Sequence, residues 1–348
     1  MFKSLSGYAF VVFLCLTLSL PAKSSDIDVA PMIVNGEDAS INDFSSFVSL
    51  YLDSIEYDGR YSARAYCGAT LLDSRYVMTA AHCVQGDLAT LLFTSAVSML
   101  ESERDFLNTD RRRVVEVYIH PGFVNNINLL LPNDIAILKL ESSASSGTAV
   151  QRVTTQSYRT TTETFVAVGH GNTSSGYDAT PILQKADLFW VSNSQCSANF
   201  LNGDNLTDNQ VCFSGEKSAT TGLKAGTCQG DSGGPIYWQR NGVYQQVGIT
   251  SFGPATCGDP TSAVTAVYTE IVDYADWIDA VLAGQVSPYI VSDEKARTDY
   301  LEMYGGIFYT DENISTTSSG GGGGGSLSWY LGLVLLLVAS YRNLLRRS

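Results

Sequence analysis

Charged side chains are scarce in this sequence, and the basic ones are the scarcer kind. Lys and Arg number 21 against 35 Asp and Glu in 348 residues, which gives a formal net charge of −14. The basic clusters are confined to residues 111–113 and the extreme C-terminus. Because nucleic-acid phosphates are attracted by a basic face, we expect no nucleic-acid partner.

Long apolar runs are lacking except near the two ends of the chain. Residues 1–25 combine Lys3, an apolar run from about residue 8 to residue 20, and then small residues. This order is typical of a secretory signal peptide, and the run is too short for a membrane anchor. We therefore expect a signal peptide over 1–25, with a buried N-terminal helix as the less favoured alternative.

The other end of the chain starts with a polar stretch and then a run of glycines, which predict a linker over 285–325. Residues 326–348 form a hydrophobic segment with an Arg-rich end. Its apolar run of about 15 residues is short against the ~20 of a spanning helix, and the terminal arginines fit a cytoplasmic flank.

This order of glycines, short apolar helix and arginines resembles the GlyGly-CTERM sorting tail of Gram-negative bacteria, which a rhomboid-type sortase processes on exported proteins. A GPI-attachment signal and a retained transmembrane helix stay open, although a basic ending is unusual for a GPI signal. The expected partner of the tail is sorting or secretion machinery. The expected location is outside the cell, secreted or at the surface, with transient membrane anchoring by the tail as one option.

Cysteine pairs with the CxxC spacing are absent, which argues against a zinc site. We assign no metal ligands and no cofactor. Six of the seven cysteines follow the predicted signal peptide: Cys67, Cys83, Cys196, Cys212, Cys228 and Cys257. An even count in an exported chain predicts three disulfides, and the count alone leaves 15 pairings open. Calcium binding between residues 90 and 110 also stays open, because no ligand spacing there is convincing.

Short apolar runs alternate with turn residues from Ile33 to about Ala283, and glycine is frequent at 31 residues. Many short strands with few helical stretches predict an all-β sandwich or barrel. One helix is expected at the end of this region, with its start near residue 271 and Gly284 beyond it. Its predicted apolar face is Ile271, Tyr274, Ile278 and Leu282.

Ser232 lies in GDSGG, a stretch that also fits the GxSxG turn of α/β-hydrolases. An α/β-hydrolase needs its histidine after the serine, whereas His82, His120 and His170 all precede it. This order argues against an α/β-hydrolase, and it disfavours a lipase or esterase. A nucleophilic serine still needs an adjacent base, so one of the three histidines is the expected base.

His82 is the best candidate, because MTAAHC places it after an apolar strand and beside a cysteine whose crosslink would hold it. His120 precedes a proline at a turn and His170 lies between glycines, so neither is expected to be catalytic. Asp134 heads the apolar strand NDIAILKL. A buried carboxylate without a partner is costly, so we expect Asp134 to pair with His82.

Four motifs occur in a fixed order: IVNG at 33–36, TAAHC at 79–83, DIAIL at 134–138 and GDSGGP at 230–235. Together they resemble the chymotrypsin and trypsin family of serine endopeptidases, whose chain order of His, Asp and Ser is the same. The resemblance covers about 33–283 and implies a protease domain over 33–284. It also implies two packed six-stranded antiparallel β-barrels, a C-terminal helix and protein or peptide substrates.

The resemblance gives each residue of the site a role. It makes His82 the general base and later the general acid, Asp134 the residue that orients it, and Ser232 the nucleophile. Backbone N–H groups of Gly230 and Ser232 would form the oxyanion hole. The implied disulfides are Cys67 with Cys83, Cys196 with Cys212, and Cys228 with Cys257.

The resemblance further implies a zymogen with a short propeptide over 26–32. Cleavage after Met32 would free the amine of Ile33, which would fold inward and pair with Asp231. The residue before the cut is usually basic in the family, and Met32 is not, so a trypsin-like activator is not expected. The activator is either an enzyme that prefers apolar residues or the protein itself.

The resemblance places the primary specificity pocket at five residues: Gly226, Ser251, Phe252, Gly253 and Ala266. In the family, an aspartate at the position of Gly226 selects Arg or Lys, and none is present here. We therefore expect cleavage after Phe, Tyr, Leu or Met, with an elastase-like preference second. Asp259 lies in a longer loop and is the alternative source of a preference for basic residues. A catalytically inactive homologue that acts as a surface binding module is the rival function, although no triad residue is missing.

Overall fold

The computed structural model describes residues 33–177, 180–307 and 314–316. The segments expected as signal peptide, propeptide and hydrophobic tail lie outside these residues. No helix in the described ranges is long and apolar enough to cross a membrane.

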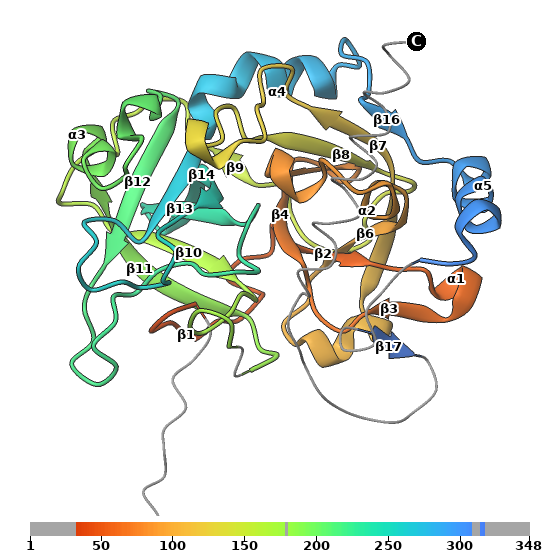
Figure 1. Cartoon of the computed structure of the whole chain (residues 1–348), viewed down its shortest axis with the longest axis horizontal. Coiled ribbons are helices and arrows are strands. Elements are labelled where there is room, and N and C mark those ends of the chain that lie inside the picture. Colours follow the sequence, from red (N-terminus) through yellow and green to blue (C-terminus); the bar gives the residue numbers. More distant parts are fainter. Residues whose placement is uncertain (1–32, 178–179, 308–313, 317–348) are drawn as a thin grey trace, which may run out of the picture.

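Six antiparallel strands form a first barrel (Figure 1). They are β2 (Phe47–Leu52), β4 (Cys67–Leu71), β5 (Tyr76–Thr79), β6 (Thr94–Ser98), β7 (Asp110–Ile119) and β8 (Ala136–Leu140). Their order is β7-β6-β2-β4-β5-β8, and β7 pairs back with β8 to close the barrel. The short helices of this half are α1 (Ile55–Asp58), η1 (Ala81–Cys83), α2 (Leu88–Phe93), η2 (Glu103–Asn108) and η3 (Ile127–Leu129).

A second barrel lies beside the first and closes through β11 and β12 (Figure 1). Its strands are β10 (Phe165–Gly169), β11 (Gln184–Val191), β12 (Gln210–Gly215), β13 (Pro235–Arg240), β14 (Val243–Phe252) and β15 (Ala266–Glu270). Two short strands join its edges, β1 (Glu37–Asp38) on β11 and β9 (Gln151–Arg152) on β14. Two short helices accompany it, α3 (Asn193–Ser197) and η4 (Gly203–Asn205).

Burial explains why these stretches become barrel strands. In β10 all five residues of FVAVG are buried, whereas buried and more exposed positions alternate along the first half of β11. Successive side chains of a strand point to opposite faces, so such patterns place one face or both against apolar neighbours. One apolar cluster contains residues of both barrels. The expected all-β fold of two six-stranded antiparallel barrels is confirmed.

The expected C-terminal helix is present as a 3-10 turn, η5 (Ile271–Tyr274), followed by α4 (Ala275–Leu282). Ile271, Tyr274 and Ile278 are buried as predicted, while Leu282 is only half-buried. Val281 takes the remaining buried position on this face. Gly284 follows the helix with φ +69°, a left-handed conformation that glycine adopts without strain.

Residues 285–307, which the sequence analysis expected to be part of a linker, are folded onto the first barrel. We call this segment the C-terminal strap. It contains β16 (Ile290–Val291), which pairs with β7, and α5 (Glu294–Tyr304), which packs near α2. Beyond it, β17 (Ile314–Thr316) pairs with β3 (Arg60–Ser62).

A buried arginine fixes the strap. Arg297 is 2% exposed, and its guanidinium donates to the carbonyls of Leu92 and Val114 at 2.8 Å each. Tyr300 packs edge-on against Phe93 of α2. The helix sequence EKARTDYLEMY is mostly polar, which is why its periodicity did not predict a packed helix.

Candidate active site

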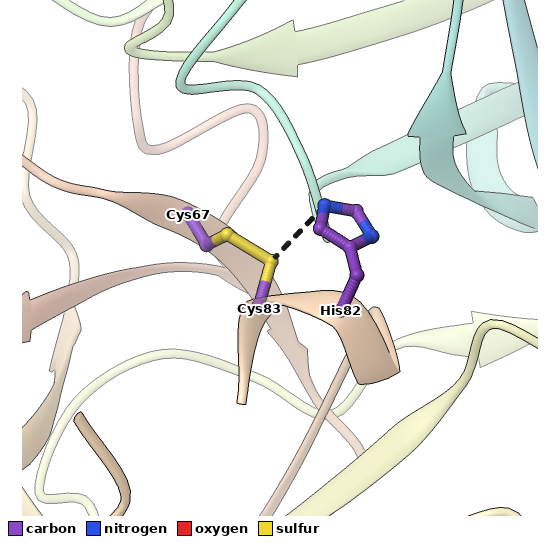
Figure 2. A group of neighbouring side chains, drawn as sticks. All are labelled: Cys67, His82 and Cys83. Carbon is purple, nitrogen blue, oxygen red and sulfur yellow. Dashed lines mark hydrogen bonds between the residues drawn. A yellow bond between two sulfur atoms is a disulfide. The ribbon is translucent and has the colours of Figure 1, made fainter. Parts of the chain in front are cut away.

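His82 lies in η1, directly after the end of β5. The next residue, Cys83, forms a disulfide with Cys67 at the start of β4, so this turn is crosslinked to a barrel strand. Figure 2 shows the imidazole beside the disulfide, with Nε2 at 3.8 Å from Cys83 Sγ. The half-exposed ring is therefore carried by a rigid turn.

Asp134 lies just before β8, and its side chain is fully buried. One carboxylate oxygen accepts from the His82 backbone N–H at 2.8 Å, and the other accepts from His82 Nδ1 at 2.7 Å. The Ser251 hydroxyl donates to the same second oxygen at 2.5 Å. Three donors thus compensate a carboxylate that burial alone would strongly disfavour.

The pKa of His82 follows from this pairing. Burial acts to lower the pKa, but the charge of Asp134 and the hydrogen bond to it outweigh burial and raise the pKa above its usual value. Because Nδ1 faces the carboxylate, Nε2 is the nitrogen that remains for proton exchange.

Ser232 lies in the turn before β13. Its carbonyl accepts from the Gly68 N–H at 2.7 Å. The adjacent Gly233 has φ +76°, and a β-carbon there would lie 2.1 Å from Thr79 Oγ1 and 3.1 Å from Ala80 N. The turn therefore lies against the residues that lead into His82. Among the described residues no hydrogen bond joins His82 Nε2 to the Ser232 hydroxyl.

Gly230 and Asp231 complete this turn. Gly230 has φ +100°, and a β-carbon at this position would lie 2.8 Å from Gly171 Cα, so only glycine fits. The Asp231 carboxylate accepts from the backbone N–H groups of Gly171 and Cys228, both at 2.8 Å. Burial raises the pKa of Asp231 to about 7, although these two hydrogen bonds act to lower it.

The residues predicted for the specificity pocket fall into two groups. Gly226 and Ala266 are buried, and a β-carbon at Gly226 would lie 2.5 Å from Thr265 Cβ. Thr265 thus occupies the space of a side chain at position 226, a contact that the sequence analysis missed. Phe252 and Gly253 instead line an open cavity of about 490 Å³.

Asp259 lines the same cavity, at its exposed side. Its carboxylate accepts from the N–H of Thr261 at 2.8 Å and from the hydroxyl of Thr261 at 2.7 Å. These contacts lower the pKa of Asp259. The acid therefore holds the turn of its own loop and remains ionised.

The sequence analysis did not foresee that Ser251, predicted only as a pocket residue, directs its hydroxyl to Asp134. The signal available was weak, since a serine at the end of a strand has many structural uses. The remaining histidines lie elsewhere. His120 contacts the rings of Tyr274 and Trp277 on the C-terminal helix.

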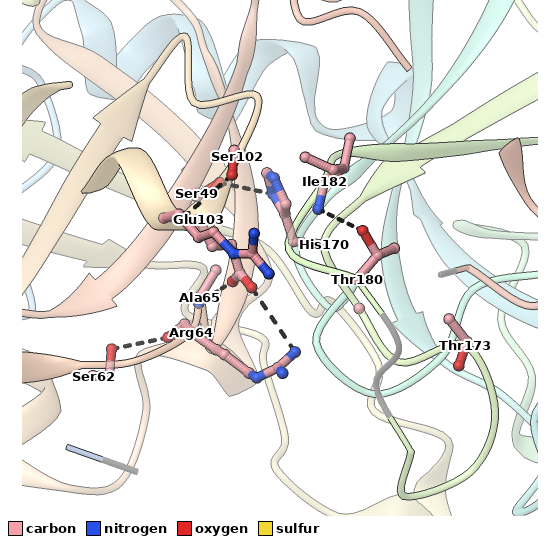
Figure 3. A network of polar contacts seen from close by, with 12 residues as sticks. Ser49, Ser62, Arg64, Ala65, Ser102, Glu103, His170, Thr173, Thr180 and Ile182 are labelled. Atoms are coloured by element: carbon pink, nitrogen blue, oxygen red, sulfur yellow. Dashed lines mark hydrogen bonds and ion pairs between the residues drawn. The ribbon is translucent and has the colours of Figure 1, made fainter. Parts of the chain in front are cut away.

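His170 is buried between the barrels and belongs to a separate polar network (Figure 3). Its Nδ1 lies 3.2 Å from the Ser49 hydroxyl, and burial lowers its pKa to about 4. In the same view Glu103 accepts from the Ala65 N–H at 2.8 Å, and burial raises its pKa to about 7. His170 is neutral in this setting, and within the described residues it forms no hydrogen bond with the Ser232 turn.

One group of side chains has the composition of a metal site but not its chemistry. The ligand atoms of Cys67, His82 and Cys83 lie within 4.8 Å of one another (Figure 2). Both sulfurs are used in the disulfide, so no thiolate is present to bind a cation.

The three disulfides join Cys67 to Cys83, Cys196 to Cys212, and Cys228 to Cys257. The predicted pairing is confirmed. The third disulfide lies next to the Ser232 turn, because Cys228 also donates its N–H to Asp231.

Two barrels that carry a histidine, a buried aspartate and a glycine-flanked serine define a serine hydrolase of the two-barrel class. The family model described as Trypsin matches residues 33–278. The chain therefore belongs to the trypsin family and is a serine endopeptidase.

Individual relatives agree with this assignment. The chain is 31% identical over 258 residues to chymotrypsin-like elastase family member 1 of Bos taurus, a match that covers 72% of this chain and 90% of that protein. It is 29% identical over 256 residues to trypsin-1 of Astacus astacus, covering 71% and 99%. The solved structure of neuropsin from mouse brain superposes with a TM-score of 0.58 at 26% identity, covering 72% of this chain and 100% of that one.

Proposed function

We propose that this endopeptidase hydrolyses peptide bonds with a triad of His82, Asp134 and Ser232. The observation that carries the proposal is the buried Asp134 carboxylate, which receives both the backbone N–H and the ring Nδ1 of His82. A carboxylate in this position fixes the tautomer of the imidazole and stabilises its charged form. The contact of the Ser232 turn with the residues before His82 supports the third member.

The proposed reaction has two halves. His82 Nε2 takes the proton of the Ser232 hydroxyl as its oxygen attacks the scissile carbonyl, and it then gives that proton to the leaving amine. Water attacks the resulting acyl-enzyme by the same proton route and releases the acid. The backbone N–H groups of Gly230 and Ser232 would donate to the oxyanion. The His82–Ser232 hydrogen bond that this step needs commonly tightens only when substrate binds.

Labelling with a fluorophosphonate tests the triad directly. Protein processed after Met32 should be labelled at Ser232, and the Ser232→Ala and His82→Ala variants should not be. Folding of each variant is checked by circular dichroism. Correctly folded, processed protein that takes up no label would instead identify an inactive homologue that serves as a surface binding module.

We also infer that the protein is made as a zymogen. Ile33 is fully buried, and Val34 exchanges two backbone hydrogen bonds with Gly226, at 2.9 and 3.2 Å. Asp231 is buried close by with backbone donors. An amine freed at Ile33 would bring the positive charge that this carboxylate lacks among the described residues. Expression of the chain with Met32 replaced should leave it uncut and inactive if this inference holds.

For specificity, we propose cleavage after large apolar or aromatic residues. Gly226 brings no acid to the base of the pocket, and Thr265 fills the adjacent space. The alternative preference for basic residues through Asp259 is less well supported, because its carboxylate is engaged with Thr261 on the exposed side of the cavity. A peptide library treated with processed enzyme tests this, and dominant cleavage after Arg or Lys would refute it.

We further propose that the protein is exported to the cell surface or medium. Three disulfides are typical of an oxidising compartment outside the cytosol. Processing of the tail by sorting machinery would fit the pattern of glycines, apolar run and arginines in the sequence. Mass spectrometry of the mature protein's two ends tests both parts of this proposal.

A further inference from the structure

The segment that leads into Asp134 has an unusual backbone. We call residues 127–134 the Asp134 loop. Leu130, Leu131 and Asn133 all have positive φ, at 56°, 45° and 59°. Asparagine tolerates this left-handed conformation, but for leucine it is costly, and Leu131 also precedes a proline, which favours extended backbone. Such conformations persist only where the surroundings enforce them.

Side chains from the second half of the chain enforce this conformation at five points along the loop. The acceptors are the carbonyls of Asn128, Leu130 and Asp134, the side-chain oxygen of Asn133 and the carboxylate of Asp134. The respective donors, in the order in which the acceptors are given, are Asn205, Gln210, Thr269, Tyr274 and Ser251. The first barrel thus contributes the loop, and the second barrel with its C-terminal helix fixes its shape.

Gln210 holds one of the two leucines with positive φ, Leu130. It lies at the start of β12, is 1% exposed, and donates from Nε2 to the Leu130 carbonyl at 2.6 Å. Its Oε1 accepts from the N–H of Thr207 at 2.9 Å and from the Thr207 hydroxyl at 3.2 Å. Because Thr207 uses the oxygen end, the amide nitrogen is directed at Leu130. Without it, the buried carbonyl of a strained leucine would lose this donor.

We propose that Gln210 is a positioning residue for the reaction: by holding Leu130 in its left-handed conformation, it sets the Asp134 carboxylate against His82. The inference rests on the proposed role of Asp134 in the triad. Loss of the Gln210 hydrogen bond would let Leu130 and Leu131 relax toward common backbone conformations. Asp134 follows only three residues after Leu131, so its carboxylate would shift relative to the His82 ring.

The test compares two buried glutamines that both connect the barrels. Gln246 is 0% exposed and accepts from the Thr70 hydroxyl at 2.8 Å, and in the part of the chain that the structure describes it forms no hydrogen bond with the Asp134 loop. Gln210→Met and Gln246→Met keep the length of each side chain and remove its amide. Both should lower stability, so stability alone does not distinguish them.

The distinguishing measurement is the pH profile of kcat/KM for the processed enzyme. Activity falls at low pH as His82 becomes protonated, and this part of the profile is its acid limb. Asp134 raises the pKa of His82, so a displaced carboxylate should move the acid limb to lower pH. We expect Gln210→Met to show this shift, together with a loss of about 10- to 100-fold in kcat, as small displacements of reacting groups produce. Gln246→Met should keep the wild-type limb. An unshifted limb and unchanged kcat in Gln210→Met would overturn the inference.

Two further variants make every result interpretable. Thr207→Val removes only the hydroxyl that orients Gln210, so it should shift the limb in the same direction by less. If Gln210→Met does not fold, this variant decides: a shift supports the inference and an unshifted limb overturns it. Asp134→Asn tests the proposed function itself. Full activity of this variant would refute the proposed role of Asp134 in the triad, independently of the result for Gln210→Met.

Discussion

The surroundings of Asp134 and of Asp231 differ in the kind of group that compensates a buried carboxylate. Asp134 receives a ring N–H and a hydroxyl as well as a backbone N–H. Asp231 receives two backbone N–H groups, and no side-chain cation pairs with it among the described residues. Burial accordingly raises the pKa of Asp231 to about 7. The comparison teaches that the first site is complete as folded, while the second is suited to receive a positive charge.

The strongest way to break the comparison is to remove the charge at the complete site. Asp134→Asn keeps the shape of the side chain but favours the wrong tautomer of His82. We expect kcat to fall by about 10⁴-fold, measured with a chromogenic peptide on processed enzyme. Titration of Ser232 with a fluorophosphonate counts the correctly folded sites. A loss of less than tenfold would show that Asp134 does not orient the base.

Removing the charge at the second site should have a smaller effect on activity. In Asp231→Asn the amine of Ile33 would have no carboxylate partner, so the Ser232 turn, which includes Gly230, would lose its fixed shape. We expect kcat/KM to fall by about 10²- to 10³-fold, comparable to the loss of an oxyanion donor. The uncut chain should lose nothing, because it has no free amine at Ile33. Equal activity of the processed variant and wild type would contradict the zymogen proposal.

The pH dependence of stability in the uncut chain tests the buried Asp231 carboxylate. The pKa of Asp231 is raised in the folded state, so the folded state binds its proton more tightly than the unfolded state does. The corresponding stability is fully present below about pH 4 and is lost as the pH rises through about 7.

Urea midpoints of the uncut chain at a series of pH values measure this loss. Asp231→Asn should partly flatten the profile between about pH 4 and 7, because asparagine does not titrate in this range. Glu103, whose pKa burial also raises to about 7, should account for part of the slope that remains. Processing after Met32 should also flatten it, because a paired carboxylate stays ionised. A profile that Asp231→Asn leaves unchanged would show that another group causes the loss.

Arg297 extends the comparison to a buried group of positive charge. It is a buried cation whose guanidinium donates to two backbone carbonyls, as two backbone N–H groups donate to Asp231. Arg297→Met should lower the free energy of unfolding by about 2 kcal/mol, because it leaves two buried carbonyls without this donor. Activity at low temperature should be unchanged.

Lys295→Met is the matched control for Arg297, since Lys295 lies on the same helix with a side chain that is 79% exposed. Its pair with Asp299 is exposed and screened by solvent, so its loss should change the stability much less than the loss of Arg297. Equal midpoints in chemical denaturation for the two variants would show that Arg297 does not fix the strap.

The sequence predicted what depends on local pattern. The short apolar runs became barrel strands, and the residues around His82, Asp134 and Ser232 could be identified because their motifs are contiguous. What it missed depends on contacts between distant residues. Thr265 beside Gly226, the Ser251 hydroxyl on Asp134 and the Gln210 amide on Leu130 each join residues that are far apart in the chain.

The C-terminal strap was missed for a related reason. Helix α5 has no continuous apolar face, and its stability comes from one buried guanidinium and a few aromatic contacts with α2. A charged residue in a polar stretch normally predicts a solvated face. Only the folded barrel supplies the carbonyls that make burial of Arg297 favourable.

The strap also determines how a mechanical load would enter the protein. A pull on the chain beyond residue 316 acts first on the pairing of β17 with β3, and then on α5 and on the pairing of β16 with β7 (Figure 1). Helix α4 and the second barrel carry that load only after the strap has peeled away. A force applied to the tail would therefore break the contacts of the strap before it reached the turn that carries Ser232.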